Sequence, residues 1–119
     1  MGGVEVAVKF REDCAIFYPH GYINNLGGEK IEQRCADVLQ DGYRKFVVNF
    51  ENSPIINSIG ISFLIGMIDR INKSEGSVCF SNLTGNNSEV FEFMGLTRFA
   101  PIFSSEEEAL HYTQEHQGG

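Results

Sequence analysis

The apolar residues of this chain follow two different periods, which separate predicted strands from predicted helices. In residues 4–10, valine or phenylalanine occupies every second position, and a short charged turn divides this segment from a second apolar segment at 14–22. Two adjoining segments of this kind predict a β-hairpin. The apolar run at 45–50 is typical of a buried parallel strand, and shorter runs at 77–81 and 102–103 predict two more strands.

Helical spacing of apolar residues appears between and after these strands. The first helix is predicted over about 29–41, after a polar loop at 21–28 in which Gly27 and Gly28 indicate a turn. The second is predicted over about 58–74. Its expected core face consists of Ile61, Leu64, Ile65, Ile68 and Ile71.

Two further helices complete the pattern. The third carries Val90 and Phe91 and is closed by Gly95. The fourth opens at Ser105, which forms a capping-box pattern with Glu108. The predicted fold class is therefore α/β, with a mixed sheet that begins with an N-terminal hairpin and about four helices packed mainly on one face.

The length of 119 residues is that of one domain. We expect a single domain over 1–119, with a core from about 4 to 113 and a frayed tail at 117–119. The net charge of −7 argues against a nucleic-acid or anionic-membrane surface. No apolar run approaches the roughly 20 residues of a membrane span, and no signal-like segment opens the chain, so a soluble cytoplasmic protein is expected.

The turn before the second predicted helix presents one serine, Ser58. Either Asn57 or Ser58 falls where a helix N-cap belongs. A hydroxyl at this place lies at the positive end of the helix dipole, beside unpaired backbone N–H groups, where an added phosphate is electrostatically favoured. On local sequence alone, a plain capping role for Ser58 is the favoured interpretation, because capping serines are common.

Several segments around this turn resemble those of the STAS domain, in particular a stand-alone anti-sigma-factor antagonist. They are Gly21-Tyr22-Ile23-Asn24, Val47-Val48-Asn49-Phe50, Asn57-Ser58-Ile59-Gly60-Ile61 and Met94-Gly95-Leu96. The resemblance implies that Ser58 is phosphorylated by an anti-sigma factor that is a serine kinase, and that a separate phosphatase removes the phosphate. The unphosphorylated form would bind the kinase and so release a sigma factor, which makes the protein a binding partner and not an enzyme.

The resemblance also implies a partner-binding surface around the serine. Helical spacing turns Phe63 away from the core face, so we expect it to project outward and pack on Ile59; the alternative is that it tucks under a neighbouring loop. The expected partner-binding residues are Asn24, Asn57, Ser58, Ile59, Gly60 and Phe63. Members of this family usually carry aspartate where this chain has Asn24, Asn49 and Asn57. We therefore expect less negative charge near Ser58 and no strongly held divalent cation.

Other chemistry finds little support in the sequence. The cysteines Cys14, Cys35 and Cys79 are odd in number and widely spaced, which favours reduced thiols over disulfides or a zinc site. The histidines show no metal-ligand pairing with them, so no metal, cofactor or catalytic residue is expected. Two alternatives remain: a non-switching STAS module that serves as scaffold or subunit of a signalling or lipid-transport assembly, and a small hydrolase.

Overall fold

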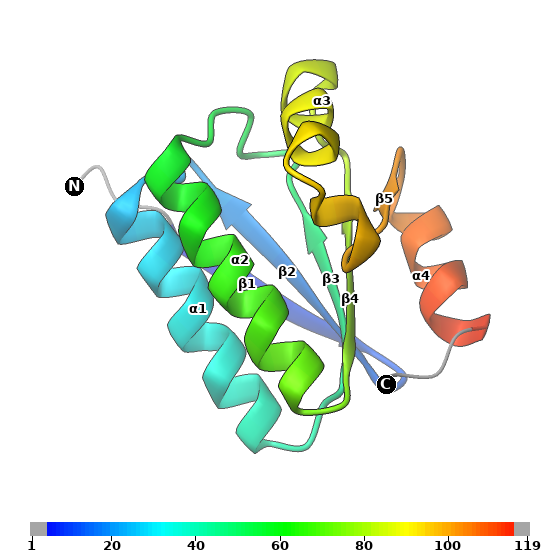
Figure 1. The fold of residues 1–119 in the computed structure, drawn as a ribbon. Helices are drawn as coiled ribbons and strands as arrows, with labels where there is room; N and C mark the ends of the chain where they lie inside the picture. The colour runs from blue at the N-terminus through cyan, green and yellow to red at the C-terminus, as the bar shows by residue number, and fades with distance from the viewer. Residues whose placement is uncertain (1–4, 116–119) are drawn as a thin grey trace.

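The computed structural model describes residues 5–115 and contains one five-stranded sheet between helices (Figure 1). The strands lie in the sheet in chain order; β1 and β2 pair antiparallel and the other three pairings are parallel. The predicted mixed sheet is confirmed. Val4 and the tail at 117–119 lie outside the described residues. The strands are β1 (Glu5–Arg11), β2 (Cys14–His20), β3 (Lys45–Asn49), β4 (Ser77–Ser81) and β5 (Ile102–Phe103).

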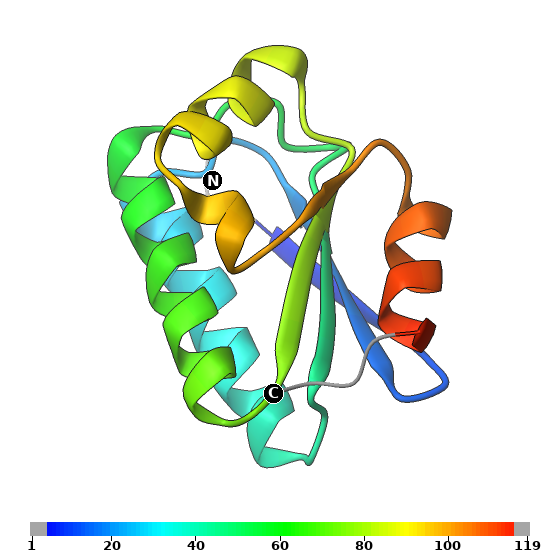
Figure 2. The ribbon, with the colours of Figure 1, turned by 45° about the vertical axis from the view of Figure 1, so that its right-hand side comes forward.

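The helices cover the two faces of the sheet unequally. Helices α1 (Asn25–Gln40) and α2 (Ser58–Lys73) lie side by side on one face, and α3 (Gly85–Phe93) with the short 3₁₀ helix η1 (Leu96–Arg98) continues that layer. Of the helices within residues 5–115, only α4 (Glu106–Glu115) packs on the opposite face, as Figure 2 shows. The prediction that the helices pack mainly on one face is confirmed.

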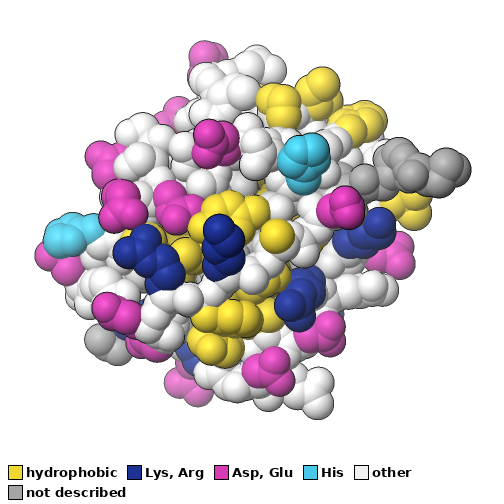
Figure 3. Space-filling model, turned by 180° about the vertical axis from the view of Figure 1, so that it is seen from behind, with side chains coloured by type: hydrophobic (Ala, Val, Ile, Leu, Met, Phe, Trp, Pro, Cys, Tyr) yellow, Lys and Arg dark blue, Asp and Glu magenta, His cyan; other side chains and the backbone are white. Residues whose placement is uncertain are grey.

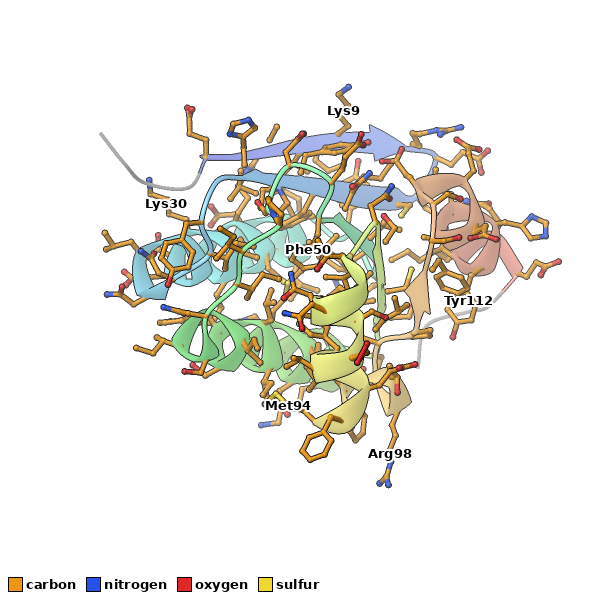
Figure 4. All side chains as sticks on the ribbon, turned by 90° about the horizontal axis from the view of Figure 1, so that it is seen from above. Lys9, Lys30, Phe50, Met94, Arg98 and Tyr112 are labelled. Carbon is orange, nitrogen blue, oxygen red and sulfur yellow. The ribbon has the colours of Figure 1, made fainter. Side chains whose placement is uncertain are left out.

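Strand alternation divides the core into two parts. On β3, Phe46 and Val48 point toward α1 and α2, whereas Val47 points toward α4. The larger part contains Phe50, which lies inside the molecule in Figure 4 and meets the ring of Phe80 edge to face, with centroids 5.4 Å apart. Side chains of α1, α2 and α3 pack into this part of the core, which therefore determines where the N-termini of these helices lie.

The face that carries α4 is only partly covered. Over β1 and β2, side chains of mixed type reach the surface, and apolar and basic groups lie next to one another there (Figure 3). Lys9 and Tyr18 form one such pair: the ammonium nitrogen of Lys9 lies 5.4 Å from the ring centroid of Tyr18. Alkyl stems and ammonium groups of this kind shield apolar surface from water without a covering helix.

Helix α1 begins four residues earlier than predicted, because Asn24 caps it. The side-chain oxygen of Asn24 accepts the backbone N–H groups of Leu26 and Gly27, each at 3.1 Å. The prediction of a turn at Gly27 and Gly28 is therefore wrong: both glycines are buried inside the helix. Gly28 is required for packing, since an added Cβ would lie 2.7 Å from the Cβ of Phe63 on α2.

The predicted core face of α2 is correct except for Ile65, which is 39% exposed. The buried face includes Met67 instead, and it is rotated so that Phe63 and Ile65 stand at its two edges. Phe63 lies toward α1, whereas Ile65 opens toward α3 and η1. The reason is the close approach of α1, which the sequence pattern of α2 alone does not reveal.

Gly60 provides a test of the packing at the start of α2. A Cβ at this position would collide with the backbone carbonyl of Ile23, which has no freedom to rotate away. We expect Gly60→Ala to lower the free energy of unfolding by about 1–3 kcal/mol, the range typical of overpacking. The measurement is urea denaturation.

The matched control is Gly85→Ala, in the first turn of α3, where nothing lies within 4 Å of the added methyl group. That change should be neutral or stabilise by roughly 0.5 kcal/mol, because alanine restricts the unfolded chain. Equal effects of the two substitutions would show that the contact with Ile23 does not constrain this helix.

Candidate functional site

Ser58 is the first residue of α2, and Asn57, not Ser58, is the cap. The Oδ1 atom of Asn57 accepts the backbone N–H of Gly60 at 2.7 Å. The Ser58 side chain is exposed, and its hydroxyl makes no hydrogen bond within residues 5–115. The sequence allowed either residue to be the N-cap. In the structure Asn57 caps the helix, which leaves the Ser58 hydroxyl free for modification.

Backbone hydrogen bonds fix the position of this turn. Ile23, in the loop between β2 and α1, donates its N–H to the carbonyl of Ile55 at 3.0 Å and accepts the N–H of Asn57 at 3.1 Å. Ile23 and Ile56 form an isolated parallel bridge. The N-termini of α1 and α2 consequently lie next to each other at one end of the molecule (Figure 1).

The charge distribution around these two helix ends is unusual for an acidic protein. Neither α1 nor α2 carries an acidic residue in its first turn, although α4 carries Glu106, Glu107 and Glu108 in its own. Unpaired N–H groups at a helix start attract negative charge. Because no carboxylate from either first turn opposes this attraction, a phosphate on Ser58 would meet a favourable local field.

Exposed apolar side chains accompany the serine. Ile59, predicted as a partner-binding residue, is about half exposed, as are Ile55 and Leu26. Tyr22 is also exposed, in the loop that the Ile23 bridge joins to the turn. Sequence reasoning missed Tyr22, Leu26 and Ile55, because the bridge that brings their segments together leaves no mark in the sequence.

Two of the predicted partner-binding residues are placed differently. The prediction that Phe63 projects outward is wrong: its side chain is half-buried against Gly28 of α1. Gly60 is buried against the carbonyl of Ile23. Both residues hold α2 in place, and the exposed part of the predicted surface is Ser58 with Ile59, beside the partly buried caps Asn57 and Asn24.

The sheet order, the antiparallel first strand and the serine turn agree with one family of proteins. A family model of the STAS domain matches residues 5–109. The chain belongs to the STAS domain family.

This STAS domain is similar to several proteins that are described as anti-sigma-factor antagonists. It is 26% identical over 82 residues to an anti-sigma-B factor antagonist of Staphylococcus aureus, covering 63% of this chain and 76% of that protein. The fold superposes on an anti-sigma factor antagonist from Mycobacterium paratuberculosis with a TM-score of 0.81 at 17% identity, covering 93% and 94% of the two chains.

A second solved structure is the Bacillus cell fate determinant SpoIIAA in its phosphorylated form. The TM-score is 0.72 at 19% identity, with 91% of this chain and 98% of that chain covered. At these identities the two structures establish a common fold. No helix within residues 5–115 has the length and apolar character needed to cross a membrane.

Asn49 of this STAS domain does not join the amides near the serine. It lies at the end of β3 with its side chain on the α4 face, where its amide nitrogen donates to the Glu106 carboxylate at 3.0 Å. Its Oδ1 accepts the N–H of Glu51 at 2.9 Å. The expected three-amide cluster is therefore wrong, because alternation along the strand turns Asn49 to the opposite face from Phe46 and Val48.

The cysteines of this STAS domain are buried free thiols. Burial raises the pKa of Cys79 to about 12 and that of Cys14 to about 11, so both remain protonated at neutral pH. A protonated, inaccessible thiol is a poor nucleophile and a poor metal ligand. Across residues 5–115 there is also no group of three His, Cys, Asp or Glu side chains positioned to hold a metal.

The amides Asn57 and Asn49 should respond in opposite ways to substitution by aspartate. Asn57→Asp keeps the acceptor for Gly60 and adds charge at a helix start, so we expect unchanged stability or a gain of about 0.3–1 kcal/mol. Asn49→Asp replaces a donor by a carboxylate beside Glu106, and we expect a loss of roughly 1–3 kcal/mol at pH 7.

The pH dependence identifies the cause of that loss. Repulsion raises the pKa of the introduced aspartate in the folded state, so the loss is complete above that raised pKa and fades as pH falls toward the ordinary value of about 3.9. Urea denaturation between pH 7 and pH 4 measures it. A deficit of Asn49→Asp that stays constant with pH would contradict the contact with Glu106.

Proposed function

We propose that this STAS domain is an anti-sigma-factor antagonist that binds an anti-sigma factor with serine kinase activity while Ser58 is unmodified. Phosphorylation of Ser58 by that kinase ends the interaction, and a serine phosphatase restores it. The observation that supports this most directly is the exposed Ser58 hydroxyl, which takes no part in capping α2.

A free hydroxyl is what phosphoryl transfer requires. The Ser58 oxygen forms a bond to the γ-phosphorus of ATP, the bond to the β-phosphate oxygen breaks, and ADP leaves. A base of the kinase takes the hydroxyl proton. Because Asn57 supplies the cap, the reaction leaves the hydrogen bond to Gly60 intact, so the fold tolerates both forms of the protein.

The phosphate would act mainly on the interface. It adds about −1.5 to −2 charges beside exposed Ile59 and Ile55, on a surface suited to apolar contact. Binding would then require desolvation of a doubly charged group, whereas the free protein keeps that group in water at a helix start. The free-energy cost therefore falls on the complex and not on folding.

In this role the domain is a binding partner without catalytic activity of its own, and it acts in the cytoplasm, where a sigma factor, ATP and the kinase meet. The alternative is a STAS module that binds a partner without a phosphorylation switch, as scaffold or subunit. The two differ in one measurable property, the phosphorylation of Ser58 by a kinase that the domain binds.

We expect mass spectrometry after incubation with the cognate kinase and Mg-ATP to find one phosphate, on Ser58. Ser58→Ala should abolish the modification with little effect on stability, because the hydroxyl makes no hydrogen bond to any described residue. The matched control is Ser62→Ala, one turn further along the same exposed side of α2, which should be phosphorylated at the wild-type rate. Phosphate on Ser62 or Thr84 with Ser58 bare would refute the assignment.

We also expect a single charge at Ser58 to weaken binding of the kinase. Ser58→Asp and Ile59→Ser should each lower the affinity at least about tenfold in isothermal titration calorimetry, the size typical of an interface hot spot. Asn86→Asp is the control, because it adds the same charge to the first turn of α3 at an exposed position. Equal losses from Asn86→Asp and Ser58→Asp would indicate a general charge effect.

A further inference from the structure

A second apolar surface lies on α3 and η1 and is separate from the serine turn. Phe93 is 93% exposed, Phe99 58% and Met94 47%. We call these three residues the α3 patch. A single exposed apolar residue is ordinary, but two phenylalanines and a methionine in one short segment, one of them almost fully in water, indicate a contact surface.

An apolar groove adjoins this patch. It lies between α2 and η1 and has a volume of about 190 Å³. An apolar cavity of about 150 Å³ holds a benzene ring, so a phenylalanine side chain has the right size to enter it. The residues that form its walls include Ile65, Ile68, Met94, Leu96 and Phe99.

The surroundings of the patch carry both signs of charge. Arg98 of η1 and Glu92 of α3 are exposed, and neither forms an ion pair within residues 5–115. Figure 4 shows that Arg98 and Met94 project on the same side of the molecule, away from α1. One small surface thus presents a projecting ring, a groove for a ring, a free cation and a free anion.

We propose that this surface binds a second copy of the chain, with Phe93 of each protomer seated in the groove of the other. An interface with twofold symmetry uses the same patch twice, so the patch must contain each feature together with its complement. Phe93 and the groove satisfy this requirement for shape, and Arg98 and Glu92 satisfy it for charge. A different protein would require only one feature of each pair.

The proposed dimer goes beyond the proposed function and does not depend on it. Ile65, which lines the groove, follows Ser58 by seven residues, or about two helical turns, and lies on nearly the same side of α2. Dimer and kinase would therefore approach neighbouring parts of one helix. Self-association can be measured with the domain alone, in the absence of any kinase.

The test is sedimentation velocity over micromolar to millimolar concentrations. We expect the wild-type chain to show a reversible monomer–dimer equilibrium, and Phe93→Ser to raise the dissociation constant at least about tenfold. Leu26→Ser is the matched control, because it removes a well-exposed apolar side chain from α1, on the far side of α2 (Figure 1), and should leave the equilibrium unchanged.

Charge reversal tests the geometry. Arg98→Glu and Glu92→Arg should each weaken the dimer, and the double variant should restore it, because each residue faces the other across the twofold axis. Three results would overturn the proposal: a wild-type chain that stays monomeric throughout, equal effects of Phe93→Ser and Leu26→Ser, or no restoration in the double variant. A monomeric chain whose kinase affinity falls with Phe93→Ser would assign the surface to the kinase.

Discussion

The arrangement of this domain depends on the backbone of one residue, Ile23. Its N–H and carbonyl join the loop after β2 to the loop after β3, through Ile55 and Asn57. Its side chain is fully buried in the core. Each loop ends in an asparagine that caps the next helix, so the same contact that joins the loops also sets the two helix starts side by side.

Small residues let α1 and α2 approach closely, and this approach explains where Ile59 and Ile65 lie. Phe63 fills the space above Gly28, and Glu32 of α1 reaches over Gly66. With that side of α2 occupied, Ile59 remains in solvent near the serine and Ile65 faces the groove beside η1. The exposure of Ile59 in the kinase-binding surface that we propose and the position of Ile65 in the groove thus both depend on this helix pair.

The sequence predicts much of this fold, because strand alternation and helical spacing follow directly from backbone geometry. The strand segments, α2 and the capped start of α4 were predictable in this way. The start of α1 was not, since a glycine pair is equally compatible with a turn and with a helix that another helix approaches. The direction of Asn49 could have been read from its register with Phe46 and Val48.

The site itself was predictable in position but not in detail. The order of an apolar strand, a polar turn and an apolar helix identifies Ser58, yet Asn57 and Ser58 are both good caps, and only the bond to Gly60 distinguishes them. The backbone of Ile23 holds this turn through two hydrogen bonds, and the phosphorylation that we propose for Ser58 breaks neither of them. The partner would distinguish a hydroxyl from a phosphate at one fixed position of the surface. Recovery of binding would then require only hydrolysis of one phosphoester, with no conformational change to follow.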